Sequence, residues 1–86
     1  MYTVFIEKRV LKDLDYLPIP DVERIKDIII ALKHEPRAQH TQKLRGYSIR
    51  YRIRQGKYRI VYEIDEKNKS VNILLIGHRK DIYRTK

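Results

Sequence analysis

The chain has 86 residues, a net charge of +9 and no cysteine. This length predicts one small domain with a thin core, and the lack of cysteine excludes a disulfide framework or a thiolate metal site. No apolar run approaches the roughly 20 residues of a membrane span, and the start Met1-Tyr2-Thr3-Val4 lacks a signal-peptide pattern. We therefore predict a single domain over residues 1–86 that is cytoplasmic and makes no membrane contact.

The positive charge is confined to one half of the chain. Residues 1–42 hold seven basic and seven acidic side chains, whereas residues 43–86 hold thirteen basic and four acidic ones. A one-sided positive field concentrates polyanions near the surface and speeds their encounter. An ordinary solvated surface is the alternative. A membrane partner is disfavoured because no amphipathic helix combines a basic face with exposed large apolar residues.

The first half of the chain predicts a strand followed by two helices. Residues 2–6 are rich in β-forming side chains and predict the strand. Residues 7–17 carry apolar side chains at helical spacing and end at Pro18. A second helix begins at Pro20-Asp21 and ends before Pro36, which disfavours helical backbone in the residue that precedes it. We expect the two helices to form an antiparallel hairpin.

The second half predicts three strands after a polar connection over residues 35–46. Residues 47–54 alternate apolar side chains with polar ones, mostly arginines, so this strand has one apolar and one basic face. A turn at Gln55-Gly56 leads to a second alternating strand over residues 58–65, and the nearly all-apolar residues 71–76 predict a central strand. The order β-α-α-β-β-β predicts an α+β fold, with the helical hairpin packed on a small, mostly antiparallel sheet.

The basic strand face is the strongest candidate for a binding site. With Gln55-Gly56 as a two-residue loop, Arg54 faces Lys57 and Arg52 faces Arg59, although a bulge near Gly56 would shift this register. Like charges placed directly opposite each other destabilise a sheet, so such a face suggests a function. Guanidinium groups offer forked donors that fit phosphate oxygens. The predicted RNA- or phosphate-binding residues are Arg45, Arg50, Arg52, Arg54, Lys57, Lys80 and Arg84.

Further candidates follow the last predicted strand. Histidine side chains ordinarily titrate near neutrality, so His78 is a candidate for moving a proton, while Tyr83 can stack on a base. For both residues an ordinary structural role is an equal alternative. The tyrosines on the apolar strand faces are expected to pack in the core; they are Tyr51, Tyr58 and Tyr62.

Metal and cofactor chemistry is poorly supported. His34 and His40 lack ligand spacing with any partner, and there is no glycine-rich phosphate loop. The acidic residues Glu63, Asp65 and Glu66 precede a turn, where solvated strand-end charges are the more common arrangement. We predict neither a metal nor a cofactor.

Four segments together carry a family resemblance. They are Lys43-Leu44-Arg45-Gly46, Tyr51-Arg52-Ile53-Arg54, Gly56-Lys57-Tyr58-Arg59-Ile60-Val61-Tyr62 and Gly77-His78-Arg79-Lys80-Asp81-Ile82-Tyr83. In this order and spacing the chain resembles the RelE branch of the RelE/ParE toxin superfamily over essentially its whole length. The resemblance implies a fold like that of microbial RNases. It also implies metal-independent cleavage of mRNA in the ribosomal A site, in which the ribose 2′-hydroxyl attacks the adjacent phosphate.

The resemblance also implies catalytic roles. Arg59 would stabilise the pentavalent phosphorane, Arg79 would contact the phosphate or leaving oxygen, and Tyr83 would stack on or orient the base. Arginines stand at positions 52 and 54, where RelE proteins often carry lysines. Because arginine does not lose its proton, these two residues are poor general bases. We therefore hypothesise that His78 assists proton transfer.

The implied partners are a small RelB-like antitoxin, the ribosome and mRNA. A different possibility is a ParE-like toxin without nuclease activity that acts on DNA gyrase. Arg59 and the Arg79…Tyr83 ending favour the nuclease, since ParE-like chains usually lack that set. A catalytically weak RNA-binding module also stays open, because lysines are missing at positions 52 and 54.

Overall fold

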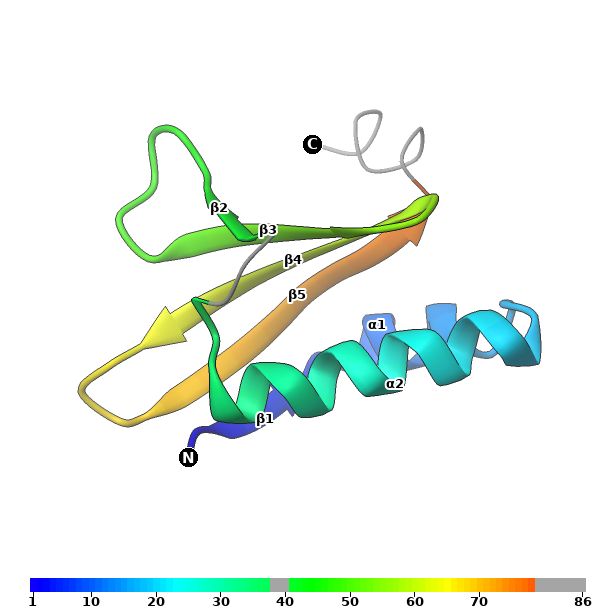
Figure 1. The fold of residues 1–86 in the computed structure, drawn as a ribbon, viewed down its shortest axis with the longest axis horizontal. Coiled ribbons are helices and arrows are strands. Elements are labelled where there is room, and N and C mark those ends of the chain that lie inside the picture. Colours follow the sequence, from blue (N-terminus) through cyan, green and yellow to red (C-terminus); the bar gives the residue numbers. More distant parts are fainter. Residues whose placement is uncertain (38–40, 79–86) are drawn as a thin grey trace.

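The computed structural model describes residues 1–37 and 41–78, apart from the side chains of Gln55 and His78. Within these residues, two helices lie on one face of a five-stranded sheet (Figure 1). The predicted α+β fold is confirmed, with one additional short strand in the segment that we expected to be a polar connection. In chain order the elements are β1 (Thr3–Ile6), α1 (Lys8–Leu14), α2 (Ile19–His34), β2 (Thr41–Lys43), β3 (Arg50–Gln55), β4 (Tyr58–Asp65) and β5 (Ser70–His78).

The helices begin and end close to the predicted positions. Pro18 precedes α2 and Pro20 lies in its first turn, where a missing backbone N–H costs nothing. Helix α2 ends at His34, just before Pro36, as expected. Helix α1 is shorter than predicted because it ends at Leu14. Its predicted apolar stripe is only partly correct, since Val10 is buried whereas Leu11 is half exposed.

The strand order is β1-β5-β4-β3-β2. Strand β1 pairs in parallel with β5, and the other three pairings are antiparallel. The sheet is therefore mostly antiparallel, as predicted. Strands β1 and β2 form opposite edges, so the neutral start of the chain and the arginine-rich hairpin of β3 and β4 are separated across the sheet.

The hydrophobic core lies between the helices and the central strands. The apolar positions of β4 and β5 pack against Val10 of α1 and Ile25 and Leu32 of α2. Tyr62 is fully buried, and its hydroxyl donates a hydrogen bond to the carbonyl of Pro36 at 2.6 Å. The expected packing of the strand tyrosines is confirmed, because Tyr58 is also buried and Tyr51 stacks on Tyr62 with ring centroids 6.0 Å apart.

The predicted register of the hairpin between β3 and β4 is wrong, because its two-residue loop lies one position further along the chain than expected. The loop consists of Gly56 and Lys57, so Arg54 lies opposite Arg59 and Arg52 lies opposite Val61. Gly56 has a φ of +59°, and a two-residue turn with glycine at its first central position accommodates that conformation without steric cost. Each residue of β3 therefore pairs with a residue of β4 two positions further along than predicted. Because side chains two residues apart lie on the same face of a strand, all four arginines predicted to share a face still share it.

The predicted strand ends also differ from the structure. Strand β3 begins at Arg50 and not at Tyr47, whose backbone N–H instead bonds the carbonyl of Leu44 in the preceding loop. Strand β5 extends to His78, which we expected to lie beyond the strand end.

A polar cluster around Glu66 connects three segments of the chain through hydrogen bonds. The Glu66 carboxylate accepts hydrogen bonds from the Tyr2 hydroxyl at 2.8 Å, from the Lys69 ammonium at 3.1 Å and from the Arg37 guanidinium. These donors, Arg37 first among them, lower the pKa of Glu66 to about 2. The cluster joins β1, the segment after α2 and the turn between β4 and β5.

Candidate functional site

The sheet face that points away from the helices carries four arginines, which we call the basic face. They are Arg50, Arg52 and Arg54 of β3 and Arg59 of β4. They share this face because they alternate with the residues that pack in the core. Their surroundings differ: Arg50 is paired with a carboxylate, whereas Arg59 forms no such pair within the described residues.

Arg59 is the most unusual residue of this face. Its side chain is only 4% exposed, yet within residues 1–37 and 41–78 it forms no ion pair with a carboxylate. Nη1 donates to the carbonyls of Tyr58 at 3.1 Å and Gly56 at 3.4 Å. The buried Nε has no hydrogen-bond partner in the described part of the chain. Because a buried charge without full pairing is costly, this guanidinium is suited to receive an anion.

Arg54 and Arg52 extend this positive charge along β3. Arg54 is exposed and lies directly opposite Arg59, so the two like charges raise the local positive potential. Arg52 is half-buried, and its Nη2 donates a hydrogen bond to Oε1 of Gln42 on β2. The pair Arg54 and Arg59 could bind one phosphate group between them.

Arg50 is engaged within the protein. Its Nε and Nη2 donate to Oε2 of Glu63 at 3.0 and 2.7 Å, and its guanidinium lies 4.2 Å from the ring centroid of Tyr47. Both members of the ion pair are largely buried. The charge of Arg50 is thus compensated in part by Glu63.

Lys57 lies near helix α2. Its ammonium is 3.8 Å from Oδ2 of Asp21, which also accepts a hydrogen bond from the Tyr58 hydroxyl at 2.8 Å. The bond to Asp21 raises the pKa of Tyr58. Asp21 therefore holds the tip of the hairpin against the helical layer, and it partly compensates the charge of Lys57.

The predicted residues at the end of the chain are only partly described. The backbone of His78 ends β5 opposite Tyr58, beside the start of the strand that carries Arg59. Arg79, Lys80, Tyr83 and Arg84 lie outside the described residues. Their roles, and that of the His78 side chain, stay predictions.

Two residues near the basic face did not stand out in the sequence. Gln42 bonds Arg52, and Asp21 fixes the hairpin tip, but a three-residue strand and one acidic residue in a first helical turn leave no distinctive pattern. Arg45 is exposed in the loop that follows β2.

The described residues give no sign of a metal centre or a membrane helix. Within residues 1–37 and 41–78, no three side chains of histidine, aspartate or glutamate gather where they could hold a metal ion. In the same part of the chain, neither helix has the length and hydropathy to cross a membrane.

Comparison with known proteins decides the family. The family model for the ParE toxin of the type II toxin–antitoxin system parDE matches residues 4–83. The chain belongs to this toxin family. The toxin is 34% identical over 86 residues to a RelE1 protein of Methanocaldococcus jannaschii, and the match covers 96% of each chain.

Solved structures support the RelE branch of the superfamily. The toxin superposes on RelE in the RelE–RelB complex of Pyrococcus horikoshii with a TM-score of 0.82, 34% identity and coverage of 91% of this chain and 94% of that one. The isolated RelE toxin of E. coli gives a TM-score of 0.81, 26% identity and coverage of 98% and 93%. The resemblance identified from the sequence motifs is therefore confirmed.

Proposed function

We propose that this toxin is a ribosome-dependent endoribonuclease of the cytoplasm that cuts mRNA in the A site and so inhibits translation. The observation that carries the proposal is the buried guanidinium of Arg59, whose Nε lacks a partner among the described residues, beside the exposed Arg54. Phosphodiester cleavage by a 2′-hydroxyl passes through a phosphorane with additional negative charge. Fixed positive groups in a shielded site stabilise such charge strongly.

The proposed reaction needs two proton transfers and no metal. The ribose 2′-oxygen bonds to phosphorus while the bond from phosphorus to the 5′-oxygen breaks, leaving a 2′,3′-cyclic phosphate and a 5′-hydroxyl. One group removes the 2′-proton and another protonates the leaving oxygen. Arg54 and Arg59 supply charge but do not lose protons, so we assign a proton-transfer role to His78.

The remaining roles rest on the family resemblance. We propose that Arg79 contacts the phosphate or leaving oxygen and that Tyr83 orients the base. Among the other predicted contacts, Arg52 and Arg45 are the better candidates for phosphate binding. Arg50 and Lys57 are weaker candidates because their charges face Glu63 and Asp21.

Primer extension on an mRNA translated with and without the toxin tests the proposal. We expect cuts at A-site codons with the toxin and none with the Arg59→Ala variant. RNA binding without cuts would instead favour the catalytically weak binding module.

A gyrase-directed activity is the second candidate, because the matching family model is that of the ParE toxin. The buried Arg59 argues for the nuclease, since a gyrase inhibitor has no need of a phosphorane-binding group. Cleaved complexes of DNA with gyrase, together with intact mRNA, would establish the second candidate and reject the first.

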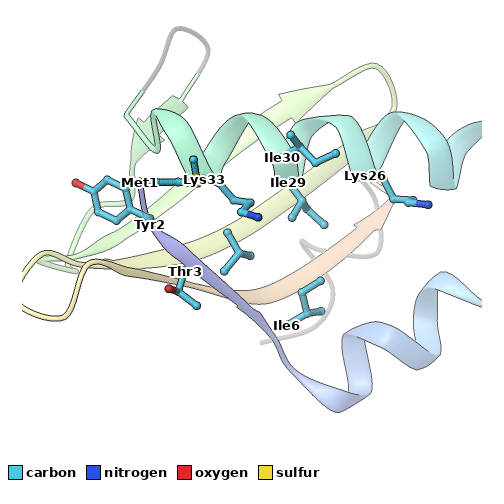
Figure 2. Close-up of a pocket in the computed structure, with 9 residues that line it drawn as sticks. Met1, Tyr2, Thr3, Ile6, Lys26, Ile29, Ile30 and Lys33 are labelled. Atoms are coloured by element: carbon cyan, nitrogen blue, oxygen red, sulfur yellow. The ribbon is translucent and has the colours of Figure 1, made fainter.

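An antitoxin is the proposed protein partner, since the related RelE of Pyrococcus horikoshii was solved in complex with RelB. An apolar groove of about 620 Å³ lies between α2 and the edge strand β1. Figure 2 shows Ile29 and Ile30 of α2 in this groove with Lys26 and Lys33 on either side of them. We propose that the antitoxin places an apolar segment with acidic flanks here, because the lysines would pair with acidic residues next to the buried segment.

A further inference from the structure

Two neighbouring clefts lie at the β2 edge and are lined in part by arginines that we proposed above as phosphate contacts. The larger, which we call the loop cleft, has a volume of about 510 Å³, and the smaller, the edge cleft, has about 370 Å³. Both are lined by Gln42 and Arg52, so they adjoin each other beside the basic face. The edge cleft also includes Arg54, which lies opposite Arg59. The clefts thus continue from the proposed reaction centre toward the loop after β2.

Among the residues that the structure describes, every charged side chain that lines the two clefts is positive. The loop cleft contains Lys43, Arg45 and Arg52, and the edge cleft contains Arg52 and Arg54. Elsewhere, by contrast, the pocket between α2 and the hairpin tip is lined by Asp21. An array of cations of this kind favours a polyanion over a mixed-charge protein surface.

The spacing of the cations suits a nucleic acid strand. Arg52 and Arg54 are two residues apart on one face of β3, which places their Cα atoms roughly 6.8 Å apart at about 3.4 Å per residue. That separation is comparable to the reach of one extended nucleotide. With the reacting phosphate at Arg54 and Arg59, Arg52 is placed to bind the next phosphate along the strand.

Tyr47 adds an aromatic surface to the loop cleft. Tyr47 is 49% exposed although its aromatic ring is large, and the Arg50 guanidinium lies over that ring at 4.2 Å. The ion pair with Glu63 holds Arg50 in place, so the ring is supported from one side. A supported, half-exposed ring beside cations is the usual arrangement for stacking a base of single-stranded nucleic acid.

We propose that the loop cleft is a binding subsite for a nucleotide of single-stranded RNA adjacent to the reacting phosphodiester. The base stacks on Tyr47, Arg52 binds the phosphate that joins this nucleotide to the reaction centre, and Arg45 with Lys43 binds the following phosphate. This inference rests on the proposed function for the identity of the reacting group. It adds a subsite that would extend substrate contacts beyond the reaction centre.

Chemical-shift titration of the ¹⁵N-labelled toxin with 2′-O-methyl oligouridylates tests the subsite. The methyl group prevents cleavage, so binding is measured whether or not the toxin is a nuclease. We expect a dinucleotide to shift the amides around Gly56 and Arg59. A tetranucleotide should also shift those of residues 42–47 and bind at least about ten-fold more tightly.

Matched variants test whether the gain in affinity for the tetranucleotide comes from the loop cleft. Tyr47→Ala should remove most of the ten-fold gain from the longer RNA, and Tyr47→Phe should keep it because the ring remains. Tyr16→Ala is the control, since Tyr16 is 87% exposed between the two helices and far from the cleft in sequence. Arg45→Ala should lower the slope of log K against log salt by about 0.7, the value for one phosphate of a single strand.

Three outcomes would overturn the inference. They are unshifted amides of residues 42–47 with the tetranucleotide, equal affinities of Tyr47→Ala and Tyr16→Ala, and tetraglutamate binding in the cleft as tightly as RNA. The proposed function fails separately, if translating ribosomes show no cuts that depend on Arg59. A toxin that binds the tetranucleotide in the cleft without cutting mRNA would retain the subsite and lose the nuclease.

Discussion

The two edges of the sheet present opposite kinds of surface. At the β1 edge the groove is floored by isoleucines, and the large side chains of Met1, Phe5 and Ile30 are exposed. At the β2 edge the clefts are lined by lysine and arginines. Apolar surface is stabilised by burial, which salt affects little, whereas cationic surface gains affinity by releasing counterions. One small fold thus presents two chemically different surfaces, which we propose bind a protein and RNA respectively.

The largest effect is expected at Arg59. Arg59→Ala should lower the rate of mRNA cleavage on programmed ribosomes by roughly 10²–10³-fold, because it removes the buried donor nearest to the developing charge. Arg50→Ala is the matched control and should cost far less, since Arg50 is paired with Glu63. Circular dichroism should show both variants folded. A cleavage rate within three-fold of wild type for Arg59→Ala would contradict the proposed chemistry.

The next effect concerns the groove at the β1 edge. Ile30→Asp should weaken binding of the antitoxin by roughly 30-fold or more in calorimetry, because it loses apolar burial at the centre of the interface and repels acidic flanks. The rate of mRNA cleavage should not change, since the basic face is untouched. Ile19→Asp serves as the control because Ile19 is also exposed to solvent but is not among the residues that line the groove. Equal losses for both variants would mean that the antitoxin binds elsewhere.

A smaller effect is a difference between the two edges in how strongly ligand binding depends on salt concentration. Binding of single-stranded RNA to Arg54→Ala should show a slope of log K against log salt that is reduced by about 0.7, with little change for Arg50→Ala. The Lys33→Ala variant at the opposite edge should leave this slope unchanged and alter antitoxin binding instead. Equal slopes for Arg54→Ala and wild type would show that Arg54 does not bind phosphate.

The smallest effect is a loss of stability in acid that arises at the polar cluster around Glu66. Folding lowers the pKa of Glu66 from its ordinary 4.5 to about 2, so its contribution is complete above pH 4.5 and is lost as the pH falls toward 2. In Glu66→Gln this pH-dependent part should disappear, which melting temperatures between pH 6 and pH 2 would reveal. Glu23→Gln, on the exposed side of α2, is the control. Identical acid profiles for wild type and Glu66→Gln would exclude the role of the cluster.

Several features of the fold were predictable because they depend on local patterns. Alternation of apolar and polar residues placed the core tyrosines on one face of the sheet and the arginines on the other. Proline positions bounded the second helix. Strand β2 was missed because three polar residues form no pattern, and its pairing depends on β3 rather than on its own sequence.

The site was predictable in composition but not in its energetics. The sequence identified Arg59 as a candidate but contained no sign that it is buried while Arg54, directly opposite, is exposed. It also gave no sign that Glu63 engages Arg50, or that Asp21 lies beside Lys57, because those contacts join residues 13 and 36 positions apart. Long-range pairs of this kind follow from strand register and helix packing.

The sequence by itself determined the toxin's charge asymmetry, its two-faced strands and the motifs that mark its family. These properties depend on residue identity and short-range periodicity, which can be recognised without knowing how the chain packs. Only the tertiary structure decided the register at Gly56, the parallel pairing of β1 with β5, and the placement of an apolar groove and cationic clefts at different edges of one sheet. Those features depend on which distant segments pack together, since burial and pairing are properties of the assembled fold.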